Sequence, residues 1–400
     1  MGNPHLAGIA TWLGSPAAAC ALSYAAIFLV LGLELPYLPV WLDGRGFSAV
    51  EIGLIIGGPL WVRIVAGPLI GVAADRFAAN RALIIVLALV ATAAALALGG
   101  VRDLVLVMAL VAVVLVASQS SLPLIDMLAI ETARRDRRDY GRMRLWGSVA
   151  FIVANLAGGA AIARAGSEAV IWLIAGASAL AALAALRLPR RDAQNAVVTT
   201  AASPKPGLDR GAVVGLLTDR RFLLLIVAAG AVQASHAVYY GFSVLAWQRL
   251  GWSSGWIGVL WATGVAAEIV LFSVSGRVVA AVGAGRLLAL GALGGVLRWT
   301  AMAAEPGPWP TALLQLLHAV SFGATYLATV HLIQAIAPPG RGATAQALNS
   351  ALGSGLAMAL ALIGAGLMYR THGAGAYLAM AALAGVGLLA AVGLGRRWGR

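Results

Sequence analysis

Eight residues that can carry charge or exchange a proton lie inside long apolar stretches of this chain. They are Glu34, Arg63, Asp126, His236, Glu268, Arg298, His318 and His331. A charged side chain in the middle of a bilayer costs about 3 kcal/mol or more, so such groups are normally paired, turned inward and functional. A carboxylate near a guanidinium and an imidazole can hold a proton and release it when a partner is displaced. These residue types indicate ion binding and proton transfer, provided that helices bring them together.

Twelve apolar runs are long enough to supply those helices. Of the 400 residues, 61% are hydrophobic and 11% are charged, whereas a soluble domain is about half apolar and a quarter charged. A membrane-spanning helix needs about 20 apolar residues, and runs this continuous are too long for the strands of a barrel. The sequence therefore predicts an all-α membrane protein with transmembrane helices near 17–41, 50–73, 82–100, 104–130, 145–163, 169–187, 221–246, 254–280, 287–303, 310–336, 343–368 and 375–395.

An internal repeat divides these helices into two pseudo-symmetric six-helix bundles. The segment Gly46 to Ser48 returns as Gly251 to Ser253, and the same offset of 205 residues pairs Arg63 with Glu268. In so apolar a chain, a repeat of this length is typical of a secondary transporter with its substrate site between the halves. We therefore expect Arg63 and Glu268 to face one central cavity. The predicted domains are an N-terminal bundle at 1–187, a cytoplasmic linker at 188–219 and a C-terminal bundle at 220–400.

The arginines predict the orientation and the partners. With both termini in the cytoplasm, the cluster Arg134 to Arg144 and the tail Arg396 to Arg400 lie on the cytoplasmic side of an inner membrane, and few arginines lie opposite. This asymmetry explains the net charge of +13 without nucleic acid as a partner. The expected partners are the lipid bilayer, a small solute and protons, for a chain that acts as a monomer. The single cysteine, Cys20, excludes an internal disulfide, and we find no motif for a metal, a cofactor or an enzyme.

The segment after the second predicted helix resembles the signature of the major facilitator superfamily. Gly71, Asp75 and Arg76 match it, whereas Ala78 and Ala79 replace the usual glycine and second basic residue. The resemblance implies that these three residues latch the two halves together on the cytoplasmic side.

A longer resemblance, to the 3-phenylpropionate permease branch of that superfamily and to the related lactose permeases, extends along most of the chain. It is carried by the block Tyr140 to Ser148, by the block His236 to Ser243, and by Trp261, Glu268 and Arg298-Trp299. It implies proton-coupled uptake of a small organic solute.

Residue by residue, the resemblance implies a proton-coupling cluster of Glu268, Arg298 and His318. The alternative is a static ion pair that braces two helices. Lactose permeases have an acid one turn beyond the histidine, where this chain has Ser321. The proton must then reside elsewhere, and Glu268 is the preferred carrier.

The resemblance also implies that Asp126 and Arg144 grip the substrate, although Arg144 could instead be one of the cytoplasmic anchors. Phe151 stands where lactose permeases stack a sugar on tryptophan. A phenyl ring pairs better with another aromatic ring than with a sugar, so Phe151 favours an aromatic solute.

Arg63 has no acid within one turn on its own helix. We expect Glu34 as its resting partner and a substrate carboxylate as its working partner, because a guanidinium binds a carboxylate with two parallel hydrogen bonds. A permanent Glu34–Arg63 brace is the alternative. His236 and Tyr240 are candidate lining residues, but a lone histidine in an apolar helix is as often simply satisfied by a neighbouring hydroxyl or carbonyl.

Taken together, these patterns predict a proton-coupled symporter for a small aromatic monocarboxylate, such as a phenylpropanoid acid. A proton-coupled sugar or nucleoside symporter is the alternative that Asp126 and Arg144 favour. A second alternative, a membrane sensor or scaffold that transports nothing, would be favoured by a large soluble domain, and the sequence has none.

Overall fold

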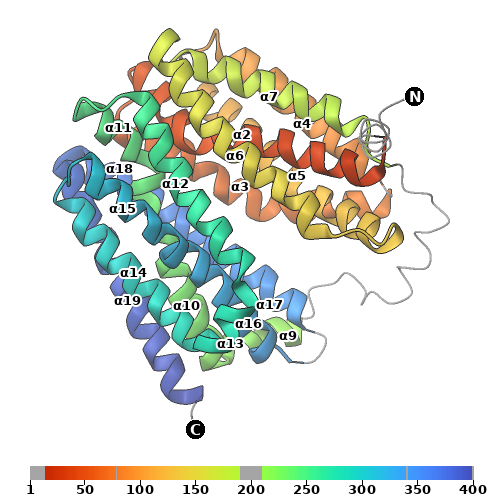
Figure 1. Cartoon of the computed structure of the whole chain (residues 1–400), viewed down its shortest axis with the longest axis vertical. Coiled ribbons are helices and arrows are strands. Elements are labelled where there is room, and N and C mark those ends of the chain that lie inside the picture. The colour runs from red at the N-terminus through yellow and green to blue at the C-terminus, as the bar shows by residue number, and fades with distance from the viewer. Residues whose placement is uncertain (1–13, 78, 190–209, 339–340, 399–400) are drawn as a thin grey trace, which may run out of the picture. The chain divides into compact units, whose positions relative to one another are not determined.

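The computed structural model describes residues 14–77, 79–189, 210–338 and 341–398, and every regular element within them is a helix (Figure 1). By contacts between residues the chain forms two units, which are described separately. Unit 1 comprises Met1–Arg45 and Val62–Lys205, and unit 2 comprises Gly46–Trp61 and Pro206–Arg400. Most of the predicted linker lies outside the described residues.

Unit 1 is built from long helices with well-formed starts. Ser15 accepts a hydrogen bond from the backbone of Ala18 ahead of the first helix, and Asp103 and Asp139 cap two later helices in the same way. The helices are α2 (Pro16–Gly44), α3 (Ala49–Arg76), whose first half belongs to unit 2, α4 (Asn80–Leu98), α5 (Leu104–Arg135), α6 (Tyr140–Ala165) and α7 (Ala169–Ala185).

The most buried helix of unit 1 is α2, which packs against α5, α6 and α7. Small residues permit this close packing: a Cβ atom on Gly32 would lie 2.9 Å from the carbonyl oxygen of Phe151 on α6. The central position of α2 brings Tyr24, Phe28 and Glu34 between the other helices of the unit.

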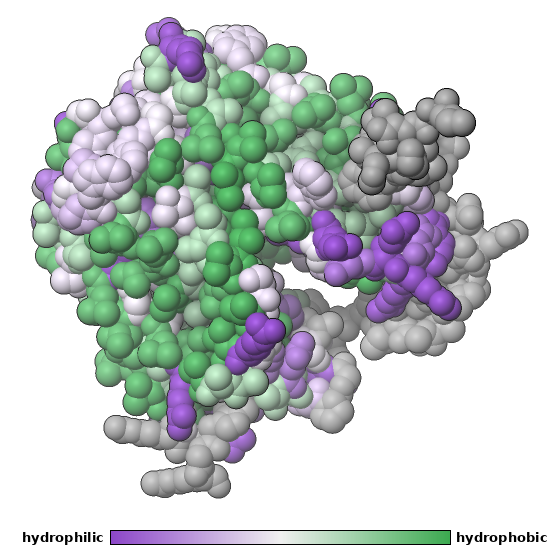
Figure 2. Space-filling model, in the orientation of Figure 1, coloured by the Kyte–Doolittle hydropathy of each residue, from purple (hydrophilic) through white to green (hydrophobic). Residues whose placement is uncertain are grey.

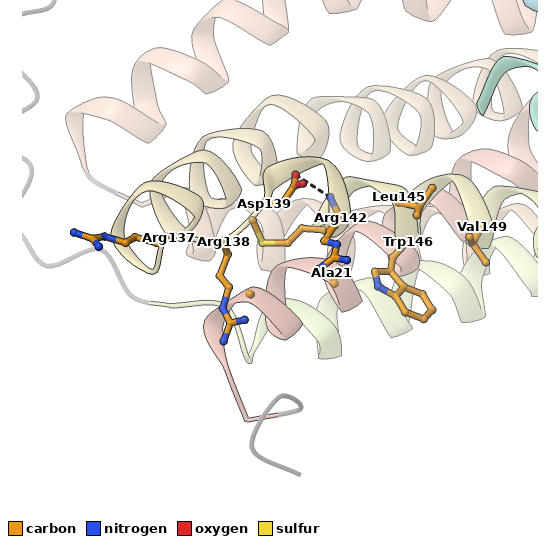
Figure 3. Close-up of a pocket in the computed structure, with 10 residues that line it drawn as sticks. Ala21, Arg137, Arg138, Asp139, Arg142, Leu145, Trp146 and Val149 are labelled. Atoms are coloured by element: carbon orange, nitrogen blue, oxygen red, sulfur yellow. Dashed lines mark hydrogen bonds between the residues drawn. The ribbon is translucent and has the colours of Figure 1, made fainter. Parts of the chain in front are cut away.

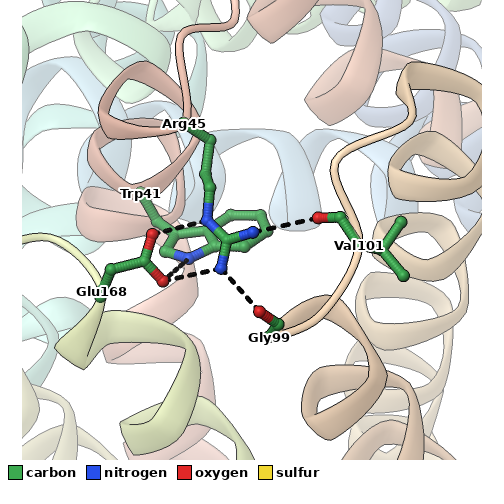
Figure 4. Close-up of polar contacts among 5 residues, drawn as sticks. All are labelled: Trp41, Arg45, Gly99, Val101 and Glu168. Carbon is green, nitrogen blue, oxygen red and sulfur yellow. Dashed lines mark hydrogen bonds and ion pairs between the residues drawn. The ribbon is translucent and has the colours of Figure 1, made fainter.

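Arg45 fastens the ends of three segments of unit 1 (Figure 4). Its guanidinium forms an ion pair with Glu168 at 2.5 Å and donates hydrogen bonds to the carbonyl oxygens of Gly99 at 2.9 Å and Val101 at 3.1 Å. Trp41 also donates to Glu168, at 3.3 Å. The hydrogen bond from Arg45 is the main reason that the pKa of Glu168 is lowered. This cluster ties the end of α2 to the α4–α5 connection and to the start of α7.

Unit 2 contains more, and shorter, helical segments than unit 1. They are α9 (Arg210–Thr218), α10 (Arg220–Ala234), α11 (Ala237–Arg249), α12 (Ser254–Ser273), α13 (Ser275–Val282), α14 (Ala284–Ala303), α15 (Pro308–His318), the π-helical η1 (Ala319–Ala324), α16 (Thr325–Ile336), α17 (Gly342–Asn349), the π-helical η2 (Ser350–Ala357), α18 (Met358–His372), the short 3₁₀ turn η3 (Gly373–Gly375) and α19 (Ala376–Trp398). Within unit 2, α14 packs against α16, α19 and η1, and α12 packs against α15 and η1.

Each of the twelve predicted spans corresponds to helix in the described part of the chain. By length and composition nine helices could cross a membrane there, or ten if α13 and α14, bent by 103°, form one span. The apolar stretch Thr344–Gly395 has 52 residues. As one helix it would be about 78 Å long, which is more than twice the thickness of a bilayer core. The helix is interrupted at Gly373, whose φ of 54° ends α18, so the stretch represents two spans. The remaining helix, α7, is apolar but slightly shorter than the others.

The surface agrees with this membrane assignment. Figure 2 shows hydrophobic side chains along the visible helices of each unit, and hydrophilic side chains gathered where α5 ends and α6 begins. Exposed leucines, valines and tryptophans are numerous among the described residues, as expected when lipid replaces water around a helix.

The start of α3 belongs to unit 2, although the sequence placed all of this helix in the N-terminal bundle. Glycines explain its packing against α18. A Cβ atom on Gly53 would lie 2.7 Å from the carbonyl oxygen of Leu362, and one on Gly57 would lie 3.1 Å from that of Ala359. Because only glycine permits so close an approach, these positions hold the two helices together. The domain boundaries at 1–187, 188–219 and 220–400 stay a prediction.

Candidate functional site

A buried arginine is the centre of a polar cluster in unit 2. Arg298, on α14, is fully buried. Its guanidinium donates hydrogen bonds to Gln315 Oε1 at 2.7 Å, to His318 Nδ1 at 3.1 Å and to Ser321 Oγ at 3.4 Å. The plane of the guanidinium also lies over the rings of Tyr239 and Trp299, 4.6 and 4.5 Å from their centroids. Aromatic faces attract a cation, so they compensate part of the cost of burying this charge.

His318 connects Arg298 to Glu268 on α12. The Nε2 atom of His318 lies 3.6 Å from Glu268 Oε2. Arginine can only donate hydrogen bonds, so Nδ1 of His318 must accept from it, and the hydrogen of a neutral ring is then on Nε2, facing the carboxylate. The structure thus brings Glu268, His318 and Arg298 into one series of polar contacts, while their role in proton coupling stays a prediction.

His236 joins the cluster from the break between α10 and α11. This fully buried histidine lies 3.0 Å through Nδ1 from the carbonyl oxygen of Val232 and 3.2 Å through Nε2 from Ser321 Oγ. The carbonyl must accept, so the hydrogen of a neutral His236 is on Nδ1, and Nε2 accepts from the hydroxyl. The ring also stacks on Tyr240, at a centroid distance of 5.6 Å. His236 is therefore satisfied by a carbonyl and a hydroxyl, and the hydroxyl links it to Arg298.

Two features of the backbone place this cluster. Ser321 lies within the π-helical turn η1, a wider turn than that of an α-helix and one that is frequent at functional sites. Glycines allow the neighbouring helices to approach: a Cβ atom on Gly294 would lie 2.8 Å from Val320, and one on Gly264 would lie 3.3 Å from the Cβ of His318. The cluster is consequently packed, not open.

Unit 1 contains a second, smaller polar cluster around Asp126. Its carboxylate accepts hydrogen bonds from Tyr24 at 2.5 Å and from Tyr140 at 3.0 Å. The guanidinium of Arg144 lies over the rings of Phe28 and Tyr24, 4.1 and 5.5 Å from their centroids. Asp126 and Arg144 are therefore brought together through Tyr24 and do not form an ion pair with each other.

The expected ion pair between Glu34 and Arg63 is not formed. Arg63 donates to the side-chain oxygen of Gln119, and Glu34 accepts from Ser118 at 3.0 Å, while its second oxygen has no hydrogen-bond partner in the described part of the chain. Ser118 and Gln119 are adjacent on α5, so their side chains point about 100° apart around that helix. This geometry holds the acid and the base on different faces of α5, which is why the pairing expected from charge alone was wrong.

The chain matches the MFS_1 like family over residues 19–379. It belongs to that family. The "Probable 3-phenylpropionic acid transporter" of Escherichia coli (strain K12) is 31% identical to it, over 91% of this chain and 94% of that protein. The "Maltose permease" of Geobacillus stearothermophilus is also 31% identical, over 94% of each chain. The predicted resemblance to major facilitator transporters, and to the phenylpropionate permeases among them, is confirmed.

Solved structures show the same fold. The nucleoside transporter NupG has a TM-score of 0.82 at 15% identity, covering 96% of this chain and 99% of that one. A bacterial homologue of the human lysosomal transporter Spinster has a TM-score of 0.65 at 15% identity, covering 95% of each chain. At such identities the likeness concerns the fold alone. This MFS_1-like protein is a multi-pass membrane transporter and, like its relatives, not an enzyme.

The other predicted site residues of this transporter show fewer contacts. Phe151 is half-buried, and its carbonyl oxygen accepts from Asn155 at 2.6 Å. Gly71 has open space where a Cβ atom would stand, and Arg76 lies over the ring of Phe77. The side chain of Asp75 lies outside the described residues. The latch, and the common cavity for Arg63 and Glu268, stay predictions.

Sequence reasoning missed the neutral polar partners of the predicted charged residues. Gln119, Ser118, Gln315 and Tyr24 each hold a predicted charged residue or histidine in place. A signal existed for two of them, because Gln315 lies one turn before His318 and Gln119 lies in a short polar run, between Ser118 and Ser120, within a largely apolar helix. Among the described residues no group of three or more His, Cys, Asp or Glu is arranged to hold a metal ion.

Proposed function

We propose that this transporter is a proton-coupled symporter that imports a small aromatic monocarboxylate. The observation that carries the proposal is the environment of Arg298. Among the described residues its hydrogen-bond partners are an imidazole, an amide and a hydroxyl, and its Nε atom has no partner. A fully buried guanidinium that lacks a directly bonded carboxylate is suited to receive one from a substrate, through charge-assisted hydrogen bonds.

The rings around Arg298 support an aromatic substrate. Tyr239 stacks on Trp261 at a centroid distance of 4.5 Å, and Trp299 stacks on Tyr377 at 5.7 Å. A pair of aromatic rings in contact is stabilised by about 0.5–1.5 kcal/mol more than the apolar area that it buries would give. One relative is named for 3-phenylpropionic acid, which has a phenyl ring and one carboxylate.

Glu268 is the proposed seat of the coupled proton. An inside-negative potential of about 100 mV opposes the entry of one negative charge by about 2.3 kcal/mol, so a carboxylate needs at least one accompanying proton. Glu268 is the carboxylate that the cluster contains, and its side chain is still 20% exposed, so a proton has a route to it. Substrate bound at Arg298 would disturb the contact with His318, and through His318 the affinity of Glu268 for its proton.

The test separates coupling from binding. Glu268→Gln in proteoliposomes should retain exchange of labelled 3-phenylpropionate between equal pools and lose accumulation in response to an imposed pH step. Glu305→Gln, the same chemical change in the loop before α15, is the matched control and should retain both. Accumulation by Glu268→Gln at the wild-type level would remove Glu268 as the proton carrier.

Competition experiments identify the substrate class. 3-Phenylpropionate should inhibit its own labelled uptake, whereas 3-phenylpropanol, of similar shape but without the charge, should inhibit at least tenfold less. Arg298→Gln should abolish the difference between the two. Equal inhibition by the acid and the alcohol would show that no cation in the site recognises the carboxylate.

Symport of a sugar or a nucleoside is the second candidate. It is favoured by the Asp126 cluster, where a carboxylate and an arginine both contact Tyr24, and by the relative named maltose permease. Inhibition of uptake by maltose or uridine, with no effect of aromatic acids, would select this candidate. The sensor or scaffold alternative is set aside, because the relatives are transporters.

The remaining assignments complete the proposal. We place the chain in an inner membrane as a monomer, with both termini and the 188–219 linker in the cytoplasm, between bundles 1–187 and 220–400. Arg63, Glu34, Asp126, Arg144, Phe151, His236 and Tyr240 are proposed to line the substrate path, and Gly71, Asp75 and Arg76 to form the latch.

A further inference from the structure

A groove of about 730 Å³ lies on unit 1, beside the connection between α5 and α6. It is formed entirely by residues of this unit. Figure 3 shows arginine side chains at one end of the groove and apolar side chains along α6 at the other. The lining residues are Ala17, Ala21, Arg137, Arg138, Asp139, Arg142, Met143, Leu145, Trp146 and Val149.

The charged end of the groove has an excess of cations. Arg137, Arg138 and Arg142 are all exposed, and no described residue accepts a hydrogen bond from the guanidinium groups of Arg137 or Arg142. The two acids nearby are already engaged: Asp136 pairs with Arg135 at 2.8 Å, and Asp139 caps α6 by accepting from the backbone of Gly141 at 2.7 Å. Three arginines therefore line this end of the groove with few counter-charges, an arrangement that attracts a phosphate.

The apolar end follows directly from helical spacing. Arg142, Trp146 and Val149 recur at intervals of four and three residues, so they occupy one face of α6. Along this face the side chains change from charged to apolar over about 10 Å. Trp146 and Val149 are 48% and 41% exposed, and the small residues Ala17 and Ala21 of α2 leave space beside them. A tryptophan between charged and apolar groups is typical of the level of lipid headgroups.

We propose that this groove binds one anionic phospholipid. The phosphate lies at the charged end of the groove, which Arg137, Arg138 and Arg142 line, and an acyl chain runs along Trp146 and Val149. A dissolved anion would make no use of the apolar wall, and a zwitterionic lipid would bring a second positive charge to the same arginines. Basic pockets between helices on the cytoplasmic side of a membrane favour anionic headgroups for these reasons, and the arginine asymmetry of the sequence predicts that side for this groove.

A fluorophore in the groove provides the test. In a Cys20→Ser background, Val149→Cys is labelled with bimane and reconstituted into phosphatidylcholine vesicles that contain a small fraction of a doxyl-labelled lipid. Doxyl-phosphatidylglycerol should quench the bimane much more strongly than doxyl-phosphatidylcholine with the same chains. Bimane on Val105→Cys, a highly exposed position at the start of α5, is the matched control and should be quenched equally by both lipids.

In a second experiment the arginines of the groove are replaced by glutamine, and a variant that loses the same charge outside the groove is the control. Each of Arg137→Gln, Arg138→Gln and Arg142→Gln should lower the preference for phosphatidylglycerol about fivefold, and the triple variant about a hundredfold. The triple variant Arg134→Gln, Arg220→Gln, Arg221→Gln removes the same charge outside the groove and should leave the preference within about twofold.

Three results would overturn the proposal. They are equal quenching at Val149 by the two lipids, an equal loss of preference in both triple variants, and relief of quenching by millimolar glycerol 3-phosphate in the aqueous phase. The last would show a site for a soluble phosphate in place of a lipid.

Discussion

At the scale of single residues, Arg298 and Glu34 are buried charges with different surroundings. Arg298 donates to three side-chain acceptors and lies over aromatic rings. Glu34 receives one hydrogen bond, from Ser118, and among the described residues its second oxygen has no partner. A buried polar atom without a partner costs about 1–3 kcal/mol. Residues retained at such a cost are commonly functional.

Replacing Glu34 should therefore stabilise the fold and reduce transport. Glu34→Gln still accepts from Ser118 and removes a buried acid, so we expect the thermal unfolding midpoint in detergent to rise by about 1–2 °C while uptake falls. Ser118→Ala, which removes the donor and keeps the acid, should lower the midpoint. A lower midpoint for Glu34→Gln than for the wild type would show that the acid is satisfied in a way that the structure does not contain.

Glu168 should give stability a dependence on pH. Its hydrogen bond with Arg45 lowers its pKa below the ordinary 4.5, so the pair stabilises the folded state above that value and loses this effect as pH falls through the lowered pKa. Glu168 is half-exposed, so the effect is small. Glu168→Gln should lower the unfolding midpoint by about 1–2 °C at pH 7, and the difference from wild type should shrink towards pH 4.

Two further variants test the geometry of that pair. Arg45→Gln should be more destabilising than Glu168→Gln at every pH, because it also deprives the carbonyl groups of Gly99 and Val101 of their donor. Arg102→Gln removes an exposed arginine nearby and should have almost no effect. Equal midpoints for Arg45→Gln and Arg102→Gln would mean that the cluster of Figure 4 contributes nothing measurable.

At the scale of helices, glycine determines how closely α3 and α18 approach. Gly53→Ala would place a methyl group 2.7 Å from a backbone oxygen, and backbone cannot move aside as a flexible side chain can. We expect a loss of about 1–3 kcal/mol and slower uptake. Gly58, five residues further along α3, has open space and is the matched control, while Gly57 should be intermediate. If Gly53→Ala and Gly58→Ala unfold at the same temperature, α3 is not held by this contact.

Helices were predictable where hydrophobicity alone decides them. The long apolar runs gave the positions of all twelve spans. The interruptions were not predictable: α10 breaks at His236, α13 bends away from α14 by 103°, and α15 continues through a π-helical turn. Such interruptions depend on how the side chains of neighbouring helices pack, and the hydropathy of a sequence does not describe that packing. The same holds for the site, because charged residues stand out in an apolar sequence while their neutral partners, such as Gln119 and Gln315, do not.

At the scale of the whole molecule, the orientation in the membrane is open to a direct measurement. Cys20 is fully buried, so a Cys20→Ser variant provides a background without cysteine. A membrane-impermeant maleimide should label Arg102→Cys in intact right-side-out spheroplasts and label Arg138→Cys only after the membrane is permeabilised. The reverse pattern would invert the topology, and with it the side of the bilayer on which the lipid groove lies.

The π-helical turn η1 also affects how this chain should be aligned with others. Such a turn typically accommodates one residue more than the α-helix that it interrupts. A relative with a regular α-helix at this place will match both His318 and Thr325 only if the alignment opens a one-residue gap in the middle of a membrane span. Without that gap, every position on one side of Ser321 is compared with the wrong face of the partner helix. Substitutions transferred from such a relative would then reach lipid where the interior of the helix bundle was intended.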